Sequence, residues 1–298
     1  MTSGYDTVIR LLTATTLGGL LFSTGLQLTW AEISCSLRRT RLVWMLPVNF
    51  VLVPALVFAL VRLFQIPTDV AVAMLLLAAA PFAPVVPTFT GLAKGDLALA
   101  GVLTGLFPLL SAFVTPVVCE LSLKALLGTG SLKFSVASIL LMLVSTITLP
   151  LAAGTALRHR SPALAGRLLK PIRFFSEAVG AVALAFVTIA EFQNIRSTGW
   201  KPLLAMVLSS ELSFFAGYVL SGPAAAARLV VALGTANRNI ALALLIAVAS
   251  FPGTPVVAAV VANGLLLILL GLAHVGLWRF FVSAKSTVRE GAASGTTW

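Results

Sequence analysis

Nine long apolar stretches alternate with short polar ones along almost the whole chain. They cover, approximately, residues 7–30, 41–64, 69–93, 96–124, 132–157, 173–192, 199–221, 224–250 and 255–282. Each is close to the roughly 20 residues that a helix needs to cross the hydrocarbon core of a bilayer. Because open sheet edges cannot lie in lipid, each stretch is predicted to be a helix. The pattern predicts an all-α polytopic membrane protein with about nine transmembrane helices over residues 1–283, followed by a polar, disordered cytoplasmic tail over residues 284–298.

The composition supports a membrane protein rather than a soluble one. Apolar residues make up 59% of the chain and charged residues 10%, whereas soluble domains are typically about half apolar and about a quarter charged. The net charge of +11 comes from Lys and Arg in short loops, which membrane topology explains better than nucleic-acid binding does. The cysteines, Cys35 and Cys119, have no metal-ligand or disulfide spacing around them and are interpreted as ordinary thiols.

Basic residues are divided unevenly between alternate loops. The rich loops contain Arg38, Arg39 and Arg41, then Arg158, Arg160, Arg167, Lys170 and Arg173, and finally Lys285 and Arg289. The opposite loops carry only Lys124, Lys133, Arg196 and Lys201. Because Lys and Arg are retained on the cytoplasmic side, we expect an N-terminus outside and a C-terminus in the cytoplasm, in a bacterial inner membrane.

Two of the predicted helices have an irregular centre. The third contains Pro81, Pro84 and Pro87, and each proline removes a backbone donor and clashes with the preceding turn. The eighth contains Gly234-Thr235-Ala236-Asn237-Arg238-Asn239. Broken helices in both halves of a chain are typical of a transporter site, where half-helix ends offer dipoles to an anion and carbonyls to a cation. Two kinked structural helices are the alternative, but the intramembrane charge of Arg238 favours a site.

Three segments of the chain carry motifs, one near the first basic loop and two beside the breaks. They read Thr24-Gly25-Leu26-Gln27-Leu28 before the first basic loop, Thr90-Gly91-Leu92-Ala93-Lys94-Gly95-Asp96-Leu97-Ala98-Leu99, and Asn239-Ile240-Ala241-Leu242-Ala243 followed by Phe251, Pro255, Val256 and Val257. Together they resemble the bile acid:sodium symporter family. The resemblance implies an inverted-repeat transporter in which two broken helices cross in a core that moves against a panel. The panel would contain the helices near 7–30, 132–157 and 173–192, and the core those near 41–124 and 199–282, without the first helix of the ten-helix form.

The chain departs from this family where its members bind sodium. The resemblance implies that four residues stand at ligand positions without offering a side-chain oxygen: Val86, Pro87, Ala100 and Gly234. Thr104 is retained, Asn49 is a shorter amide than the family's, and Arg238 replaces a glutamine. Because a guanidinium repels sodium, sodium binding is disfavoured. We expect Arg238 to act as a tethered cation and to pair with a substrate carboxylate or sulfonate.

Glu211, near the middle of the seventh predicted helix, is the candidate partner of Arg238. A structural Glu211–Arg238 ion pair and an open, substrate-facing Arg238 are both consistent with the sequence. Glu211 is also the candidate proton carrier, because burial readily moves the pKa of a carboxyl group. The polar residues that flank the breaks are expected to cap backbone groups or to contact substrate: Thr88, Thr90, Thr235, Asn237 and Asn239. Asp96 is expected to cap a helix, and His159 and His274 receive no role.

These features favour a secondary transporter of a small organic anion that works by alternating access without sodium, with proton coupling, exchange and uniport all open. The alternatives are a sodium-coupled symporter of the same family and a non-transporting membrane receptor or scaffold. The sequence contains no H-E-x-x-H, no G-x-S-x-G and no phosphate-binding glycine loop, so no enzyme, cofactor or metal centre is expected. The expected partners are the anion and the lipid bilayer, with no nucleic acid; the substrate and the oligomeric state stay open.

Overall fold

The computed structural model describes residues 2–29, 42–128, 134–221 and 224–294, and every regular element in this part of the chain is helical. Within these described residues, eight helical segments are apolar and long enough to cross a membrane: Gly4–Gln27, Val43–Phe64, Leu97–Leu127, Val136–Arg160, Pro162–Ala190, Trp200–Leu220, Ala225–Ser250 and Val256–Phe281. They correspond to eight of the nine predicted stretches. The prediction of an all-α polytopic membrane protein is therefore confirmed.

The remaining predicted stretch, residues 69–93, is split into two short helices. Helix α5 (Thr68–Ala78) and helix α6 (Val86–Leu92) are separated by the segment that contains Pro81 and Pro84. The eighth stretch is split in the same way into α13 (Ala225–Ala236) and α14 (Ile240–Ser250), with Asn237–Asn239 between them. Both interruptions predicted from the sequence are present.

The remaining helices follow the chain in order. They are α1 (Thr2–Gln27), α3 (Leu42–Pro47), α4 (Val53–Phe64), α7 (Leu97–Leu127), α8 (Val136–Leu143), α9 (Leu149–Arg160), α10 (Pro162–Ala190), α11 (Phe192–Arg196), α12 (Trp200–Leu220) and α15 (Val256–Ser294). Two π-helical segments, η1 (Val48–Leu52) and η2 (Val144–Thr148), join α3 to α4 and α8 to α9.

Each π-helical segment ends two residues before a proline. In η1 the Val53 N–H donates to Val48 O, and in η2 the Leu149 N–H donates to Val144 O, one residue further back than in an α-helix. Pro54 and Pro150 follow immediately. A proline ring collides with the carbonyl four residues earlier and leaves it without a donor, so the wider π turn re-pairs the backbone around that point. Such bulges often occur at functional sites.

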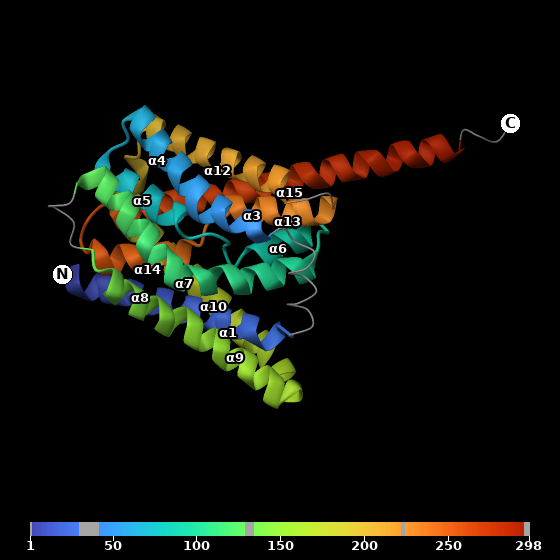
Figure 1. Ribbon diagram of the computed structural model, residues 1–298, viewed down its shortest axis with the longest axis horizontal. Helices are drawn as coiled ribbons and strands as arrows, with labels where there is room; N and C mark the ends of the chain where they lie inside the picture. The colour runs from blue at the N-terminus through green and yellow to red at the C-terminus, as the bar shows by residue number, and fades with distance from the viewer. Residues whose placement is uncertain (1, 30–41, 129–133, 222–223, 295–298) are drawn as a thin grey trace.

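The helices pack in two groups. Helix α1 packs against α9 and α10, and these helices lie together below α14 and α7 in Figure 1. The other group contains α4, α5, α12, α13 and α15, which pack on one another in the upper half of that view. A Cβ atom added to Gly154 on α9 would collide with the backbone of Phe22 on α1. Glycine therefore allows these two helices the close approach that is common between membrane helices.

Two boundaries differ from prediction. The basic segment placed in a loop is helical: Arg158 and Arg160 end α9, and only Ser161 separates α9 from α10, which begins at Pro162. Proline is favoured in the first turn of a helix, so Ser161-Pro162 starts α10 about ten residues early. Helix α15 continues to Ser294, as its projection in Figure 1 shows, so most of the segment predicted to be a disordered tail is helical here. A helix that is already nucleated extends easily through a segment without proline.

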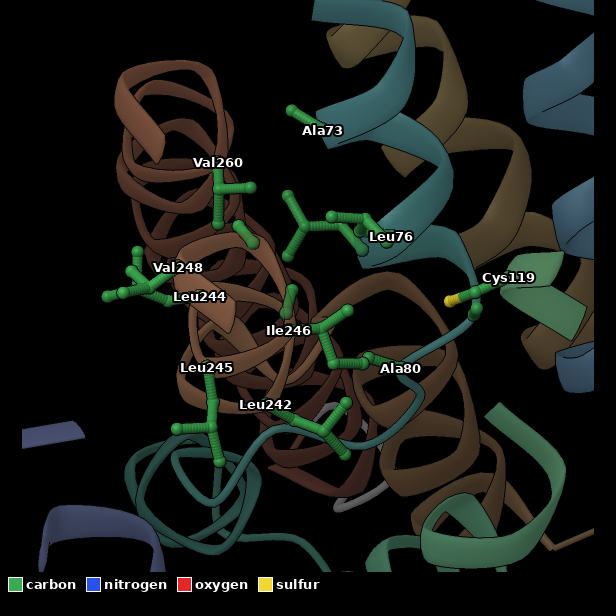
Figure 2. Close-up of a cluster of buried hydrophobic side chains, with 14 of the residues drawn as sticks. Ala73, Leu76, Ala80, Cys119, Leu242, Leu244, Leu245, Ile246, Val248 and Val260 are labelled. Atoms are coloured by element: carbon green, nitrogen blue, oxygen red, sulfur yellow. The ribbon is translucent and has the colours of Figure 1, made fainter. Parts of the chain in front are cut away.

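Apolar side chains fill the space between α5, α14 and α15. Figure 2 shows Leu76 and Ala80 facing Leu242 and Ile246, with Val260 and Cys119 at the same cluster. Cys119 is a buried, free thiol, as expected, whereas Cys35 lies outside the described residues. This cluster holds the two half-helices α5 and α14 together on one side of the break.

Candidate substrate and ion site

The two broken helices meet at their interruptions and hydrogen-bond to each other through the backbone. Phe82 N donates to Gly234 O at 3.2 Å, and Ala83 N donates to Asn237 O at 3.0 Å. In the reverse direction, Asn239 N donates to Ala80 O at 2.7 Å. Backbone groups freed by a break in a membrane helix must find partners within the protein. Here each break supplies partners to the other, which holds the two half-helix pairs in one crossing.

Arg238 is buried in this crossing, with 4% of its surface exposed. Its Nη1 donates to Ala78 O at 3.2 Å and to Asn49 O at 3.5 Å. Ala78 is the last residue of α5, where the helix macrodipole concentrates negative potential, and Asn49 lies in the π-helical segment η1. Within the described residues, Nη2 has no hydrogen-bond partner. The guanidinium thus occupies a position rich in backbone oxygens, which is the kind of position that a bound cation would take.

Polar side chains from three elements surround the crossing. Asn49 Nδ2 donates to Met45 O at 3.0 Å and to Thr235 Oγ1 at 3.3 Å, which ties η1 to α13. Asn237 Nδ2 donates to Leu233 O at 2.9 Å, and Asn239 Oδ1 caps α14 by accepting from Leu242 N at 3.1 Å. These residues therefore cap the freed backbone groups, which is the smaller of the two roles expected for them.

The flanking residues of the first break separate into two environments. Thr90 is fully buried on α6, and its Oγ1 has no partner in the part of the chain that is described. Thr88 lies two residues earlier and is exposed, and its Oγ1 accepts from Arg173 Nη2 on α10 at 3.5 Å. Asp96 caps α7 through Leu99 N at 2.9 Å, as predicted.

A cavity of about 240 Å³ lies beside the first break. One wall is formed by α1 and α10, and the other by the prolines of the first break and by α7. Its polar lining residues are Ser23, Thr24, Gln27, Thr104, Arg173 and Glu177. Thr104 is buried, and its Oγ1 has no partner among the described groups. Arg173 Nε binds Glu177 Oε1 at 2.8 Å, so the cavity holds one cation, one carboxylate and several hydroxyl and amide groups.

Arg238 does not line this cavity. It borders a separate cavity of about 20 Å³, enclosed by α4, α5, α12, α13 and α15, to which Ser209, Ser210, Ser213 and Asn263 also contribute. That volume is enough for about one water molecule. Of these two cavities beside the crossing, the larger is the candidate position for an organic anion, and the smaller is a polar pocket behind Arg238.

Comparison with known proteins shows to which family the chain belongs. The model of the Sodium Bile acid symporter family matches residues 14–198, which is more than half of the chain. No curated protein matches.

The chain belongs to the sodium bile acid symporter family.

Membership in this family assigns the chain to membrane transport, which agrees with the apolar spans and the crossed broken helices. The match includes α5, the first break, α6 and the whole lining of the larger cavity. It ends before α12, so the second break with Arg238 is not part of the matched segment.

The sequence resemblance implied four sodium-ligand positions, and three of them, Val86, Ala100 and Gly234, lie in tightly packed surroundings. Phe82 is fully buried and lies over Gly234, where an added Cβ would overlap three atoms of its ring. The same ring stacks on Phe107, with centroids 4.1 Å apart and an interplanar angle of 13°. Ala100 belongs to this aromatic cluster, and Val86 is buried in a neighbouring apolar one. Pro87 lines the larger cavity. An aromatic ring thus fills the space into which a longer residue at position 234 would extend.

Glu211 and Arg238 are not paired. Glu211 Oε2 lies 3.0 Å from Nε2 of His274 on α15, whereas Arg238 contacts backbone carbonyls and, among the described residues, no carboxylate within salt-bridge distance. Of the two arrangements considered for Arg238, the structure excludes the ion pair with Glu211. The two residues face different neighbours because α12 presents Glu211 toward α15 and not toward the α5–α13 crossing.

Three cavity or ion-pair residues were not anticipated in these roles. Arg173 was assigned to a loop, because α10 was expected to begin at residue 173; the signal that would have corrected this is Ser161-Pro162. Gln27 belonged to a motif but was given no role, although Ser23 and Gln27 are one turn apart on α1. His274 was left without a partner because its partner lies 63 residues away.

Proposed function

We propose that this protein is a secondary transporter that moves a small organic anion by alternating access and does not bind sodium, with Arg238 as a permanent replacement for the ion. The observation that carries this proposal is the contact of Arg238 Nη1 with Ala78 O and Asn49 O. A cation that stabilises the crossing has to neutralise the carbonyl end of α5, and a guanidinium does so without leaving the site.

The surroundings of Gly234 support the same conclusion. A hard cation such as sodium needs several oxygen ligands, and the ring of Phe82 occupies the place where a carboxylate at position 234 would extend. A second positive charge beside a buried guanidinium is strongly unfavourable, since Coulomb repulsion is poorly screened in the interior. We therefore expect no sodium site of appreciable affinity.

We assign the anion to the cavity of about 240 Å³ that is lined by α1, α10, the first break and α7. Arg173 lines this cavity, and its Nη2 donates to Thr88 Oγ1 at 3.5 Å, so this contact bridges α10 and α6. An anionic group that competes for Arg173 would draw the arginine away from Glu177 and Thr88. Arg238 then serves the crossing, and Arg173 serves the substrate. This differs from the sequence-based expectation, in which Arg238 had both tasks.

The first experiment measures the melting temperature of the purified protein in detergent while sodium replaces potassium at constant ionic strength. A ligand that binds only the folded state at about 100 times its Kd would add about 2.7 kcal/mol of stability. We expect sodium and potassium to give the same curve. A sodium-specific rise in melting temperature would refute the proposal and would favour sodium-coupled symport.

The second experiment measures flux. Proteoliposomes loaded with unlabelled taurocholate, a bile acid anion chosen for the family's name, are diluted into radiolabelled taurocholate, and counterflow is followed in potassium buffer. We expect uptake above that of protein-free liposomes, and an unchanged rate in sodium. Arg238→Gln should lose most of the counterflow. The matched control is Glu120→Gln, which alters a carboxylate paired with Lys124 on α7, away from both sites. Absence of counterflow with taurocholate and with other organic anions would favour the receptor or scaffold.

We also propose that the N-terminus faces the outside of a bacterial inner membrane and that the C-terminus is cytoplasmic. The basic residues around the turn at Ser161 support this orientation. They lie at the same end of the bundle as the end of α1, where Gln27 borders the larger cavity. Reporter fusions after Ser221 and Phe251 should give opposite signals, with the first cytoplasmic; the reverse result would overturn the orientation.

A further inference from the structure

A carboxylate and an imidazole form a pair inside the membrane-spanning region, outside the lining of both cavities described above. Glu211 lies in the centre of the span Trp200–Leu220, and His274 lies in the span Val256–Phe281. Their side chains meet at 3.0 Å between Oε2 and Nε2. Ionisable residues within transmembrane segments are rare, and they often take part in proton transfer.

The two groups of the pair are enclosed to different degrees. The His274 side chain is 9% exposed, and the Glu211 side chain is 45% exposed. The imidazole stacks on the ring of Phe214, with centroids 4.0 Å apart and an interplanar angle of 8°. Its Nδ1 is buried and has no hydrogen-bond partner within the described residues. The imidazole is thus packed between the ring of Phe214 and the carboxylate of Glu211, while the carboxylate itself is partly exposed on α12.

The charge of the pair depends on how many protons it holds. With one proton, the pair is either a carboxylate with an imidazolium or a carboxyl group with a neutral imidazole, and both have zero net charge. With no proton, it carries an unbalanced negative charge, which is unfavourable inside a bilayer. One bound proton therefore neutralises the pair, just as a sodium ion would neutralise an anionic site.

His274 also lies close to the crossing along α15. Gly271 is three residues earlier, on the same face of the helix. A side chain at Gly271 would collide with the ring of Phe89 on α6 and with Oδ1 of Asn237 in the second break. Val275 follows His274 directly and Trp278 lies one turn later, and both pack in the apolar cluster that contains Val86 and Phe89. A shift of α15 that follows a change in the pair would therefore reach both broken helices.

Other charged groups on the neighbouring helices have partners or positions of their own. Arg62 lies over the ring of Phe58, Arg228 over Tyr218, and Lys201 over Trp200. Arg173 binds Glu177, and Arg238 binds backbone carbonyls. Asp69 and Arg196 lie in terminal turns of α5 and α11, Arg167 and Lys170 lie in the first turns of α10, and Arg279 is near the end of its span. Among the described residues, the side chains of Glu211 and His274 come within salt-bridge distance of an ionisable group only in each other.

We propose that the Glu211–His274 pair binds the proton that is carried together with the organic anion, so that a proton gradient takes the place of a sodium gradient. The proton enters the pair from one side of the membrane and leaves it to the other as the crossing changes its access. This inference rests on the proposed function, since it names the coupling ion of that transporter.

The test uses the full-length protein in proteoliposomes with taurocholate as the probe. Taurocholate stays ionised, so it does not cross the bilayer as a neutral acid. With a more acidic exterior, wild-type vesicles should accumulate the probe up to about tenfold per pH unit for one proton per anion. Glu211→Gln and His274→Gln should lose this accumulation and keep counterflow at equal pH. Glu120→Gln should keep both activities.

Two outcomes separate the inference from the proposed function. Wild-type counterflow without accumulation in a pH gradient would overturn proton coupling and leave anion transport in place. Accumulation that persists in both Glu211→Gln and His274→Gln would move the proton site elsewhere and overturn the assignment. Absence of wild-type counterflow would contradict the proposed function itself.

A third measurement does not depend on flux or on altering the pair. The chain contains two histidines, so His159→Gln leaves His274 as the single imidazole. Its ¹⁵N resonances in membranes should change with pH, together with the infrared band of a protonated carboxyl group. If neither signal responds across the pH range in which transport is active, the pair does not exchange a proton and the inference fails.

Discussion

The contact between Phe82 and Gly234 provides the sharpest test of how this site is built. The substitution is Gly234→Ala, which adds one methyl group at the crossing. A Cβ at position 234 would have three atoms of the Phe82 ring within the 3.0 Å that real Cβ atoms keep clear. Relief would need a ring displacement of the order of 1 Å, since carbon atoms pack at about 3.5–4.0 Å.

The ring has no free space into which it could move. It is fully buried and stacked on Phe107, and its backbone has a left-handed φ of 58° that restricts the position of the side chain. Overpacking of a filled core costs typically about 1–3 kcal/mol, and the rigid neighbours here place the expected cost at the upper end of that range. The readout is the free energy of unfolding in mixed micelles, with the sodium response measured on the same samples.

Two further variants define the outcome. Gly276→Ala adds the same methyl group on α15, where no atom lies within 4 Å, and it should be neutral or stabilising by about 0.5–1 kcal/mol, because alanine favours a helix over glycine. Phe82→Leu combined with Gly234→Ala should be less destabilised than the sum of the single changes, since the pair is in direct contact. If Gly234→Ala is as stable as Gly276→Ala, the ring does not occupy this space and the argument against a sodium site loses its support.

Three other substitutions test separate parts of the structure. Gly154→Val on α9 should separate this helix from α1, because a Cβ at this position already collides with the backbone of Phe22; unfolding should be easier by about 1–3 kcal/mol, and a value near zero would contradict the close packing. Arg173→Gln should weaken taurocholate binding by about 10-fold to 100-fold, since hydrogen bonds to charged groups contribute about 1.5–3 kcal/mol. The free energy of unfolding should stay nearly unchanged, because the pair of Arg173 with Glu177 is exposed. An unchanged half-saturating concentration in counterflow would show that Arg173 does not contact the anion. Asn49→Leu should destabilise the protein by about 1–3 kcal/mol, because Thr235 loses a buried donor, and an unfolding midpoint equal to that of wild type would refute this role.

The membrane architecture was predictable because it depends on local chemistry. The apolar stretches were found within a few residues for seven of the eight long spans, and both breaks were found from Pro81, Pro84 and the polar run that ends at Asn239. The π-helical segments were missed, although Pro54 and Pro150 announce them. The early start of α10 was missed as well, because charged residues were assumed to exclude a helix that in fact begins outside the apolar core.

The candidate site was less predictable. The sequence pointed to Thr104, which lines the larger cavity, and to Thr88, which accepts a hydrogen bond from Arg173. It also pointed to four polar residues that form hydrogen bonds at the crossing: Asn49, Thr235, Asn237 and Asn239. It found Arg238 but gave it a substrate to bind and Glu211 as an alternative partner. Arg173 and Gln27 line the cavity without having been proposed as substrate contacts.

The amino-acid sequence by itself determined where this chain crosses a membrane and where its helices break, since an apolar run in lipid must satisfy its own backbone and proline cannot. The tertiary structure alone decided which groups meet. It brought Phe82 over Gly234, placed the imidazole of His274 against the carboxylate of Glu211, and placed the guanidinium of Arg238 at the carbonyl end of α5. Such contacts depend on the depth and rotation of each helix relative to helices far away in the chain. Packing of the whole bundle sets both quantities, and no local pattern of residues records them.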